Sequence, residues 1–172
     1  MTTKGVFQRV LVPIEFEPAS ERETAEDRSA EVGDHEWVAV NEWTVKALEL
    51  AARIARGGEV CVVHATPEFM DFPTWMTPAR LSQLDKDARA DATAVLAAVT
   101  RRHCPGVTLR AVIRPGRALD VILAAAREEK VEAIVLAVSA RHRVSRAFLG
   151  TTADKVIRLS PCPVVVVPSG IE

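Results

Sequence analysis

Five short apolar segments, each separated from the next by a longer amphipathic or polar stretch, constrain the fold of this chain most strongly. They are rich in valine and isoleucine and cover residues 6–14, 59–65, 107–113, 133–138 and 163–168. Short β-branched apolar runs that end near proline or glycine are typical of parallel strands buried inside a sheet. We therefore predict five strands.

The stretches between these strands have helical periodicity and helix-ending signals. We predict helices from Asn41 to before Gly57, from Pro78 to about Arg102, around Leu119–Ala126, and from Thr151 to before Pro161. Regular alternation of strand and helix predicts a single doubly wound α/β domain, with a five-stranded parallel sheet and helices on both faces. Ligands of such folds bind beyond the carboxyl ends of the strands, which directs attention to residues 13–15, 64–66, 114–116 and 137–152.

One stretch interrupts this pattern between the first strand and the first helix. Residues 17–36 contain eight acidic residues and two arginines and show neither helical nor strand periodicity. We predict that they form a loop or mobile insertion, spanning about 17–41. Trp37 and Trp43 flank it, which is consistent with packing that holds the loop to the body or with a lid over a ligand.

Composition narrows the functional classes. The chain has 172 residues, a formal net charge of −1 and no apolar run long enough to span a bilayer. We expect a cytoplasmic protein with no nucleic-acid or membrane partner. Three cysteines at irregular spacing predict neither a disulfide framework nor a metal site; Cys104 is the best candidate for an exposed thiol, and His64 for a core histidine. No motif of a catalytic nucleophile or P-loop is present.

Residues 131–168 resemble the C-terminal half of the universal stress protein family. In that family the fourth strand runs into Gly-x-x-Gly, followed by nine residues and then Gly-Ser or Gly-Thr. Here the same frame holds Ala137, Ala140 and Gly150-Thr151. Further matches occur in the correct order at residues 10–16, 59–65, 114–126 and 160–167. The resemblance covers nearly the whole chain and implies a Rossmann-like, adenine nucleotide alpha hydrolase-like domain with strand order 3-2-1-4-5.

The resemblance also implies a site for ATP, with Mg²⁺ when ATP binds. A glycine-rich turn and a helix N-terminus hold phosphates through backbone N–H groups, and an alanine in place of glycine is strained wherever φ is positive. Glu15 stands where the family has aspartate, and the backbone of Ala65 is expected beside the adenine. The implied binding residues are Pro13, Ile14, Glu15, Ala65, Leu136, Ala137, Ser139, Ala140, Gly150, Thr151 and Thr152.

These observations leave three functional hypotheses. The first is a non-catalytic stress-response regulator that binds an adenine nucleotide weakly or in altered form. The second is a member of the family that binds no nucleotide and acts through protein contacts. Slow ATP hydrolysis is the third. The family also implies a homodimer formed through the last strand, at Val164, Val165, Val166 and Val167, because an apolar edge strand calls for a partner.

Overall fold

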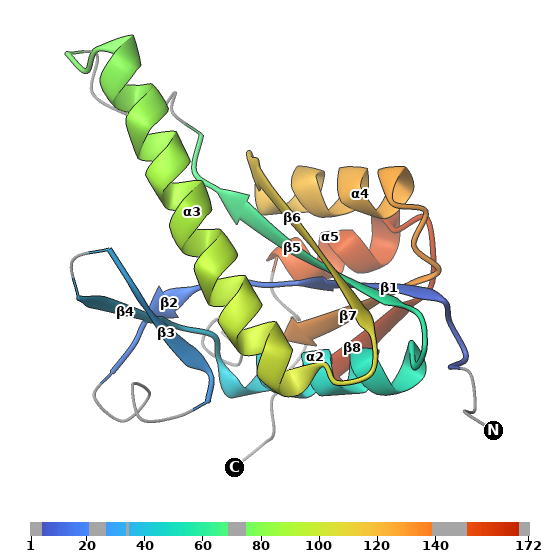
Figure 1. Cartoon of the computed structure of the whole chain (residues 1–172). Helices are drawn as coiled ribbons and strands as arrows, with labels where there is room; N and C mark the ends of the chain where they lie inside the picture. Colours follow the sequence, from blue (N-terminus) through green and yellow to red (C-terminus); the bar gives the residue numbers. More distant parts are fainter. Residues whose placement is uncertain (1–4, 21–26, 34, 69–74, 139–150, 169–172) are drawn as a thin grey trace.

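The central feature of the protein is one parallel sheet of five strands, with order β6-β5-β1-β7-β8 (Figure 1). The computed structural model describes residues 5–20, 27–33, 35–68, 75–138 and 151–168. The five strands are β1 (Arg9–Pro13), β5 (Glu59–Thr66), β6 (Thr108–Pro115), β7 (Ala133–Val138) and β8 (Val164–Pro168). Numbered along the chain, their order is 3-2-1-4-5, which confirms the doubly wound prediction.

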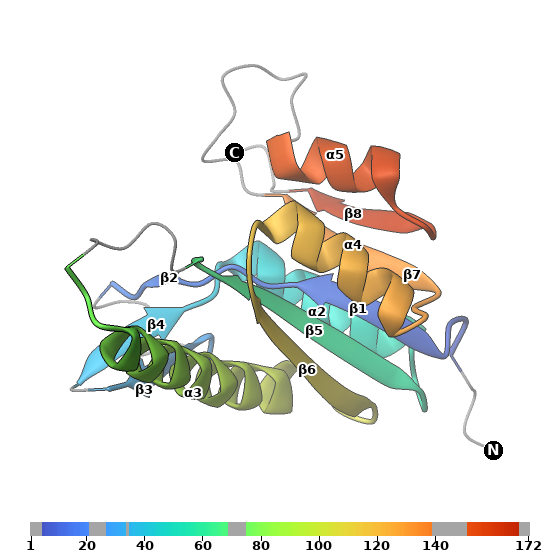
Figure 2. The ribbon, with the colours of Figure 1, turned by 90° about the horizontal axis from the view of Figure 1, so that it is seen from above.

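In the part of the chain that the structure describes, four helices cover the two faces of this sheet. They are α2 (Glu42–Ile54), α3 (Pro78–His103), α4 (Ala118–Glu128) and α5 (Thr151–Leu159). Figure 2 shows α4 and α5 on one face, with α2 and α3 on the other. The side chain of Asn41 accepts the Thr44 N–H over 2.8 Å and caps α2, at the residue where the predicted helix begins. None of the helices within the described ranges is long and apolar enough to cross a membrane.

The core divides into two layers because successive side chains of a strand point to opposite faces. Val10 and Val12 of β1 pack with α2 and α3, whereas Leu11 packs with α4 and α5. All three side chains are fully buried. Burying an aliphatic side chain of this size stabilises the fold by roughly 1.5–3 kcal/mol, so the two-sided burial of β1 explains its nearly continuous apolar sequence.

The acidic insertion is folded in its described parts, so the prediction of a loop is wrong for them. It forms a three-stranded antiparallel sheet of order β2-β4-β3, made of β2 (Glu17–Pro18), β3 (Ser29–Val32) and β4 (Glu36–Ala39). Figure 1 shows this small sheet beside α3, beyond the end of β1. Its apolar side chains, Ala30, Val32 and Val38, pack against the α2–α3 layer of the core. Helix α3, which stabilises the insertion, is therefore distant from it in the sequence.

Candidate functional site

The site expected from the fold lies at the carboxyl edge of the sheet, where β1 separates from both neighbours. The pairing of β1 with β7 extends only over Val10 and Leu11, although β7 continues to Val138. On its other side, β1 pairs with β5 as far as Val63, and the Ile14 N–H still donates to the Val63 carbonyl over 2.8 Å. The strand order changes direction at β1, which is where doubly wound folds bind ligands.

This early end of β1 leaves part of the β5 backbone without a neighbouring strand. Backbone groups alternate between the two sides of a strand, and the Thr66 carbonyl accepts the Gly116 N–H over 3.0 Å on the β6 side. The N–H and C=O of Ala65 therefore point towards β1, beyond the last paired residue, Val63. Within the described residues, no hydrogen bond uses them. Ala65 presents one donor and one acceptor side by side at the crevice.

His64 and Phe16 hold the end of β1 in place. The Nδ1 atom of His64 lies 3.0 Å from the Ile14 carbonyl oxygen, and its ring stacks on Phe16 with 4.0 Å between centroids. Because a carbonyl oxygen only accepts, Nδ1 carries the proton of this bond. Burial lowers the pKa of His64 below its usual 6.5, which favours the neutral ring. The predicted core histidine is thus half-buried and supports the site from its α3 side.

Thr66 adds a polar group to which the sequence assigned no role. Its side chain is 5% exposed, and within the described residues its Oγ1 atom has no hydrogen-bond partner. Gly116 directly follows the neighbouring strand β6; its φ of +136° requires glycine, and a Cβ there would meet Val121 Cγ2 at 3.2 Å. The sequence contained one signal for this residue: Thr66 is a hydroxyl residue that ends an apolar strand, and it belongs to residues 64–66, where a ligand was expected.

The predicted phosphate-side residues are described only in part. Ala137 lies within β7, pairs with Val167 and packs against the α2–α3 layer, whereas Leu136 faces α4 and α5. The described non-glycine residues with positive φ are His35 and Lys130, so alanine is unstrained at position 137. Ser139, Ala140 and Gly150, as well as the side chain of Thr151, lie outside the described residues.

The other predicted residues lie at the ends of two elements. Pro13 is half-buried at the end of β1, where Ile14 is buried and Glu15 is exposed. Thr152 is exposed in the first turn of α5. The structure therefore brings Pro13, Ile14 and Ala65 to the same edge of the sheet, since β1 and β5 are neighbours there.

Cys61 and Cys104 are structural, and the expectation of an exposed Cys104 is wrong. Cys104 is buried, with its Sγ 3.6 Å from the Leu48 carbonyl oxygen, and Cys61 is also buried. Burial raises the pKa of each of these two thiols to about 12. A buried thiol of this kind is protonated and unreactive at neutral pH. The described residues contain no group of three or more potential metal ligands.

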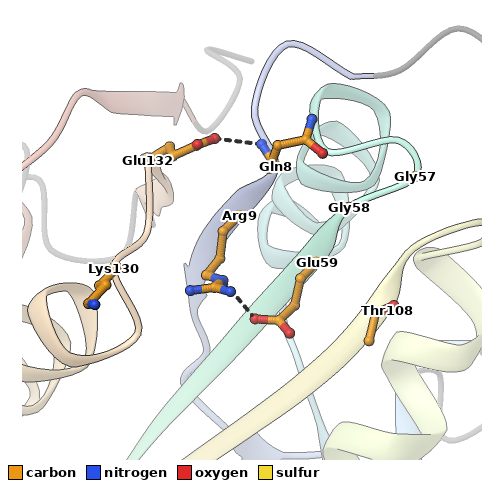
Figure 3. Close-up of a pocket in the computed structure, with 8 residues that line it drawn as sticks. All are labelled: Gln8, Arg9, Gly57, Gly58, Glu59, Thr108, Lys130 and Glu132. Carbon is orange, nitrogen blue, oxygen red and sulfur yellow. Dashed lines mark hydrogen bonds and ion pairs between the residues drawn. The ribbon is translucent and has the colours of Figure 1, made fainter.

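A separate hollow of about 350 Å³ lies at the opposite, amino edge of the sheet (Figure 3). Two of its charged residues form an ion pair, in which Arg9 Nε lies 3.1 Å from Glu59 Oε1, and the backbone N–H of Gln8 donates to Glu132 Oε2 over 2.5 Å. Arg9 Nη1 also donates to the Glu129 carbonyl. These contacts join the starts of β1, β5 and β7, so they stabilise the amino edge of the sheet.

Comparison with known proteins supports the fold described above. The model of the universal stress protein family matches residues 38–168. A curated universal stress protein from Thermus aquaticus is 33% identical over 126 residues, covering 70% of this chain and 85% of that protein. The solved structure of a Lactobacillus plantarum universal stress protein superimposes with a TM-score of 0.57 at 19% identity, covering 96% of this chain and 99% of that one.

A second solved structure carries a nucleotide. It is a protein of the same family from Arabidopsis thaliana with AMP bound, and it superimposes with a TM-score of 0.55 at 16% identity. The match covers 95% of this chain and 92% of that one. At these identities the solved structures establish the fold, while the family model and the Thermus relative establish the family. The chain belongs to the universal stress protein family.

Proposed function

We propose that this protein is a non-catalytic regulator of the stress response that binds an adenine nucleotide at the carboxyl edge of its sheet. The observation that carries the proposal is the backbone of Ala65, whose N–H and C=O face the crevice beyond the end of β1. Adenine offers an amino donor beside ring-nitrogen acceptors. A paired donor and acceptor on Ala65 complement that edge and select adenine over guanine, which carries an acceptor oxygen in place of the amino group.

The nucleotide's phosphates would lie towards the end of β7 and the start of α5. Alanine at position 137 does not oppose this arrangement, because the residue has extended backbone that alanine adopts freely. The first turn of α5 contains Thr152, and a helix N-terminus attracts anions. AMP and ATP, the latter with Mg²⁺, are the candidate ligands. The AMP-bound Arabidopsis protein of similar fold supports this choice.

The first experiment identifies the ligand. The purified protein is heat-denatured, the released small molecules are analysed by mass spectrometry, and AMP, Mg-ATP and Mg-GTP are titrated calorimetrically. Adenine nucleotides should bind and GTP should not. Ala65→Pro removes the N–H that faces the crevice and should abolish binding, whereas Ala65→Val keeps that N–H and serves as the control. Equal binding by the Ala65→Pro variant, with an unchanged circular dichroism spectrum, would refute the role of this backbone.

A second experiment tests the two alanines of the motif separately. Since Ala137 is unstrained, Ala137→Gly should leave nucleotide affinity unchanged within about threefold, which corresponds to roughly 0.7 kcal/mol. Any larger gain should come from Ala140→Gly. A tenfold or greater gain from Ala137→Gly alone would show that the extended conformation of β7 does not persist in the complex.

A protein-binding function without nucleotide is the second candidate, and the insertion favours it. Trp37 of β4 is 38% exposed, and Glu31 and Glu36 are exposed on the same small sheet. An exposed aromatic residue that lies opposite the carboxylate of Glu31 on the neighbouring strand fits a basic partner surface. This candidate stands if neither released nucleotide nor binding of AMP or Mg-ATP at millimolar concentration is detected.

The regulator proposed here acts in the cytoplasm as a homodimer. β8 is an edge strand of the sheet, and Val164–Val167 are only half-buried. An apolar edge strand of this kind requires a partner to avoid aggregation. Pairing with a second copy across a two-fold axis would use the same strand twice and close the edge.

A further inference from the structure

The large sheet ends at β6 on the side opposite β8, so β6 is an edge strand as well (Figure 2). In a strand, the N–H and C=O groups of alternate residues point to the same side. The Thr108 N–H donates over 2.8 Å to the carbonyl of Gly58, which directly precedes β5. Even-numbered residues of β6 therefore bond to β5, whereas Leu109 and Ala111 direct their backbone groups outwards.

Part of this edge is covered and part of it is open. Towards the carboxyl end of β6, Arg89 Nη1 of α3 donates to the outward carbonyl of Ile113 over 3.2 Å. Among the described residues, no hydrogen bond uses the outward N–H or C=O of Leu109 or Ala111. Leu109 is 39% exposed, and Ala111 is exposed as well. The open part, residues 109–111, thus offers two backbone donors and two acceptors.

The two faces of the sheet differ in chemistry beside this open part. Leu109 and Ala111 belong to the face covered by α2 and α3, where Ile113 packs against the core. Arg110 and Arg114 belong to the other face and form ion pairs with the end of α4. An added strand would continue both faces, because its side chains also alternate. It would therefore meet apolar side chains on one face and arginines on the other.

The arginines are held at α4, beside the edge. Arg110 Nε lies 2.6 Å from Glu129 Oε2, and its Nη2 donates to Oε1 over 3.1 Å. Arg114 Nη2 lies 2.6 Å from Glu128 Oε2. The Arg110 side chain is 53% exposed, and within the described residues its Nη1 has no hydrogen-bond or ion-pair partner. Arg110 thus has donors left for a carboxylate on an added strand.

We propose that residues 109–111 of β6 bind an extended segment of a partner protein in which acidic and apolar side chains alternate. The segment would add a strand to the sheet, about 4.8 Å from β6, and pair with the outward groups of Leu109 and Ala111. Its apolar side chains would lie beside Leu109 and Ala111, and its carboxylates beside Arg110 and Arg114.

A second copy of β6 does not fit this edge, because its charges repel. In antiparallel pairing centred on Ala111, Arg110 would lie diagonal to its own copy. Centring on Arg110 places the two Arg110 side chains directly opposite each other, and centring on Val112 places Arg110 opposite Arg114 of the copy. Like charges directly opposite each other destabilise a sheet. A partner with carboxylates avoids this repulsion. None of these residues is among the proposed nucleotide contacts, so the inference holds whether or not a nucleotide binds.

The first measurement uses the full-length protein and two fluorescein-labelled octapeptides, one that alternates glutamate with valine and one that alternates lysine with valine. In fluorescence anisotropy titrations, the glutamate peptide should bind roughly five times more tightly, because its carboxylates meet the two arginines. Equal affinity for the two peptides, or tighter binding of the lysine peptide, would overturn the proposal of an acidic partner.

Two substitutions at one position separate the backbone from the side chain. Ala111→Pro removes the outward N–H, and proline is tolerated on an edge strand where that N–H faces solvent. Binding of the glutamate peptide should weaken roughly five- to tenfold, the effect of one lost hydrogen bond. Ala111→Val keeps the N–H and should bind as the unmodified protein does. Equal binding by the two variants, with unchanged circular dichroism spectra, contradicts strand pairing at this edge.

Amide exchange followed by NMR tests the same edge without a substitution. On addition of the glutamate peptide, the amides of Leu109 and Ala111 should gain protection, whereas those of Arg110 and Val112, which face β5, should be protected throughout. Protection gained in β8 instead would show that the peptide pairs with the other edge, and the proposal would fail. It would also fail if light scattering showed that Ala111→Pro abolishes self-association, because the occupant would then be a second copy.

Discussion

His64 donates a hydrogen bond from Nδ1 to the carbonyl oxygen of Ile14 over 3.0 Å, joining the end of β5 to the end of β1. The two residues are distant in the sequence, and the contact forms only because β1 and β5 are neighbours in the sheet. Phe16 covers the same ring. This contact keeps the carboxyl edge ordered at the place where β1 leaves the sheet.

The stability of the protein should therefore depend on the protonation of His64. Burial lowers its folded-state pKa below 6.5, so above that pH both the folded and the unfolded states hold a neutral ring. As the pH falls below about 6.5, the unfolded state takes up a proton that the folded state refuses, and the free energy of unfolding decreases. Urea denaturation between pH 5 and pH 8 measures this effect. In His64→Asn, which keeps a donor but does not titrate, the dependence should be weaker; an equally steep one would assign it elsewhere.

Thiol reactivity should separate Cys162 from the other two cysteines. Cys61 and Cys104 are buried with pKa values raised to about 12, whereas Cys162 is half-buried. With Ellman's reagent at pH 8, the native protein should release one equivalent quickly, and the denatured protein three. Cys162→Ser should remove the fast equivalent. Rapid labelling of Cys104 in that variant would contradict the burial of the end of α3 against Leu48.

Replacing Lys130 with glycine should stabilise the protein. Lys130 follows α4 with φ of +51°, and the next residue, Val131, donates its N–H to the Ala126 carbonyl over 3.1 Å in a helix-ending turn. Glycine relieves the strain of the left-handed conformation, and after its own entropic cost the gain should be about 0.5–1 kcal/mol. Urea denaturation at constant m-value measures it. Lys130→Ala keeps a Cβ and should show no gain; an equal gain would locate the effect in the lysine charge.

Proline at position 166 should dissociate the proposed homodimer while preserving the monomer. The Ile134 N–H donates to the Pro163 carbonyl over 3.0 Å, so residues 163, 165 and 167 direct their backbone groups to β7. Val166 directs its N–H outwards, where a second copy would pair. Val166→Pro removes only that donor. Light scattering should then show a monomer with unchanged circular dichroism.

Two variants complete this test. Val165→Pro breaks the ladder with β7 and should lower stability whether or not a dimer forms. Val165→Lys or Val166→Lys should give a monomer or insoluble protein, because a charge replaces the apolar edge. A dimer mass retained by the Val166→Pro variant would exclude pairing through β8.

The strands of the acidic insertion could not be predicted from the sequence. Its many acidic residues obscure the pattern of the few apolar residues that pack against the core. Two of these, Ala30 and Val38, pair across two short strands. Strands of four residues carry almost no periodicity of their own, and these are stabilised by packing on α3, far along the chain. The prediction that Cys104 is exposed was wrong for the same reason, because its burial depends on Leu48 of another helix.

The β/α alternation, the five parallel strands and the edge at which a ligand is expected could all be predicted from the amino-acid sequence. These follow from local signals, since valine-rich runs, helix caps and glycine turns act within a few residues. The tertiary structure was needed to see that β1 ends before β5, that the N–H and C=O of Ala65 have no hydrogen-bond partner among the described residues, and that Ala137 is extended. Each of these depends on which strands lie side by side and where their pairing stops, and a single strand's residues do not encode the length of its neighbour.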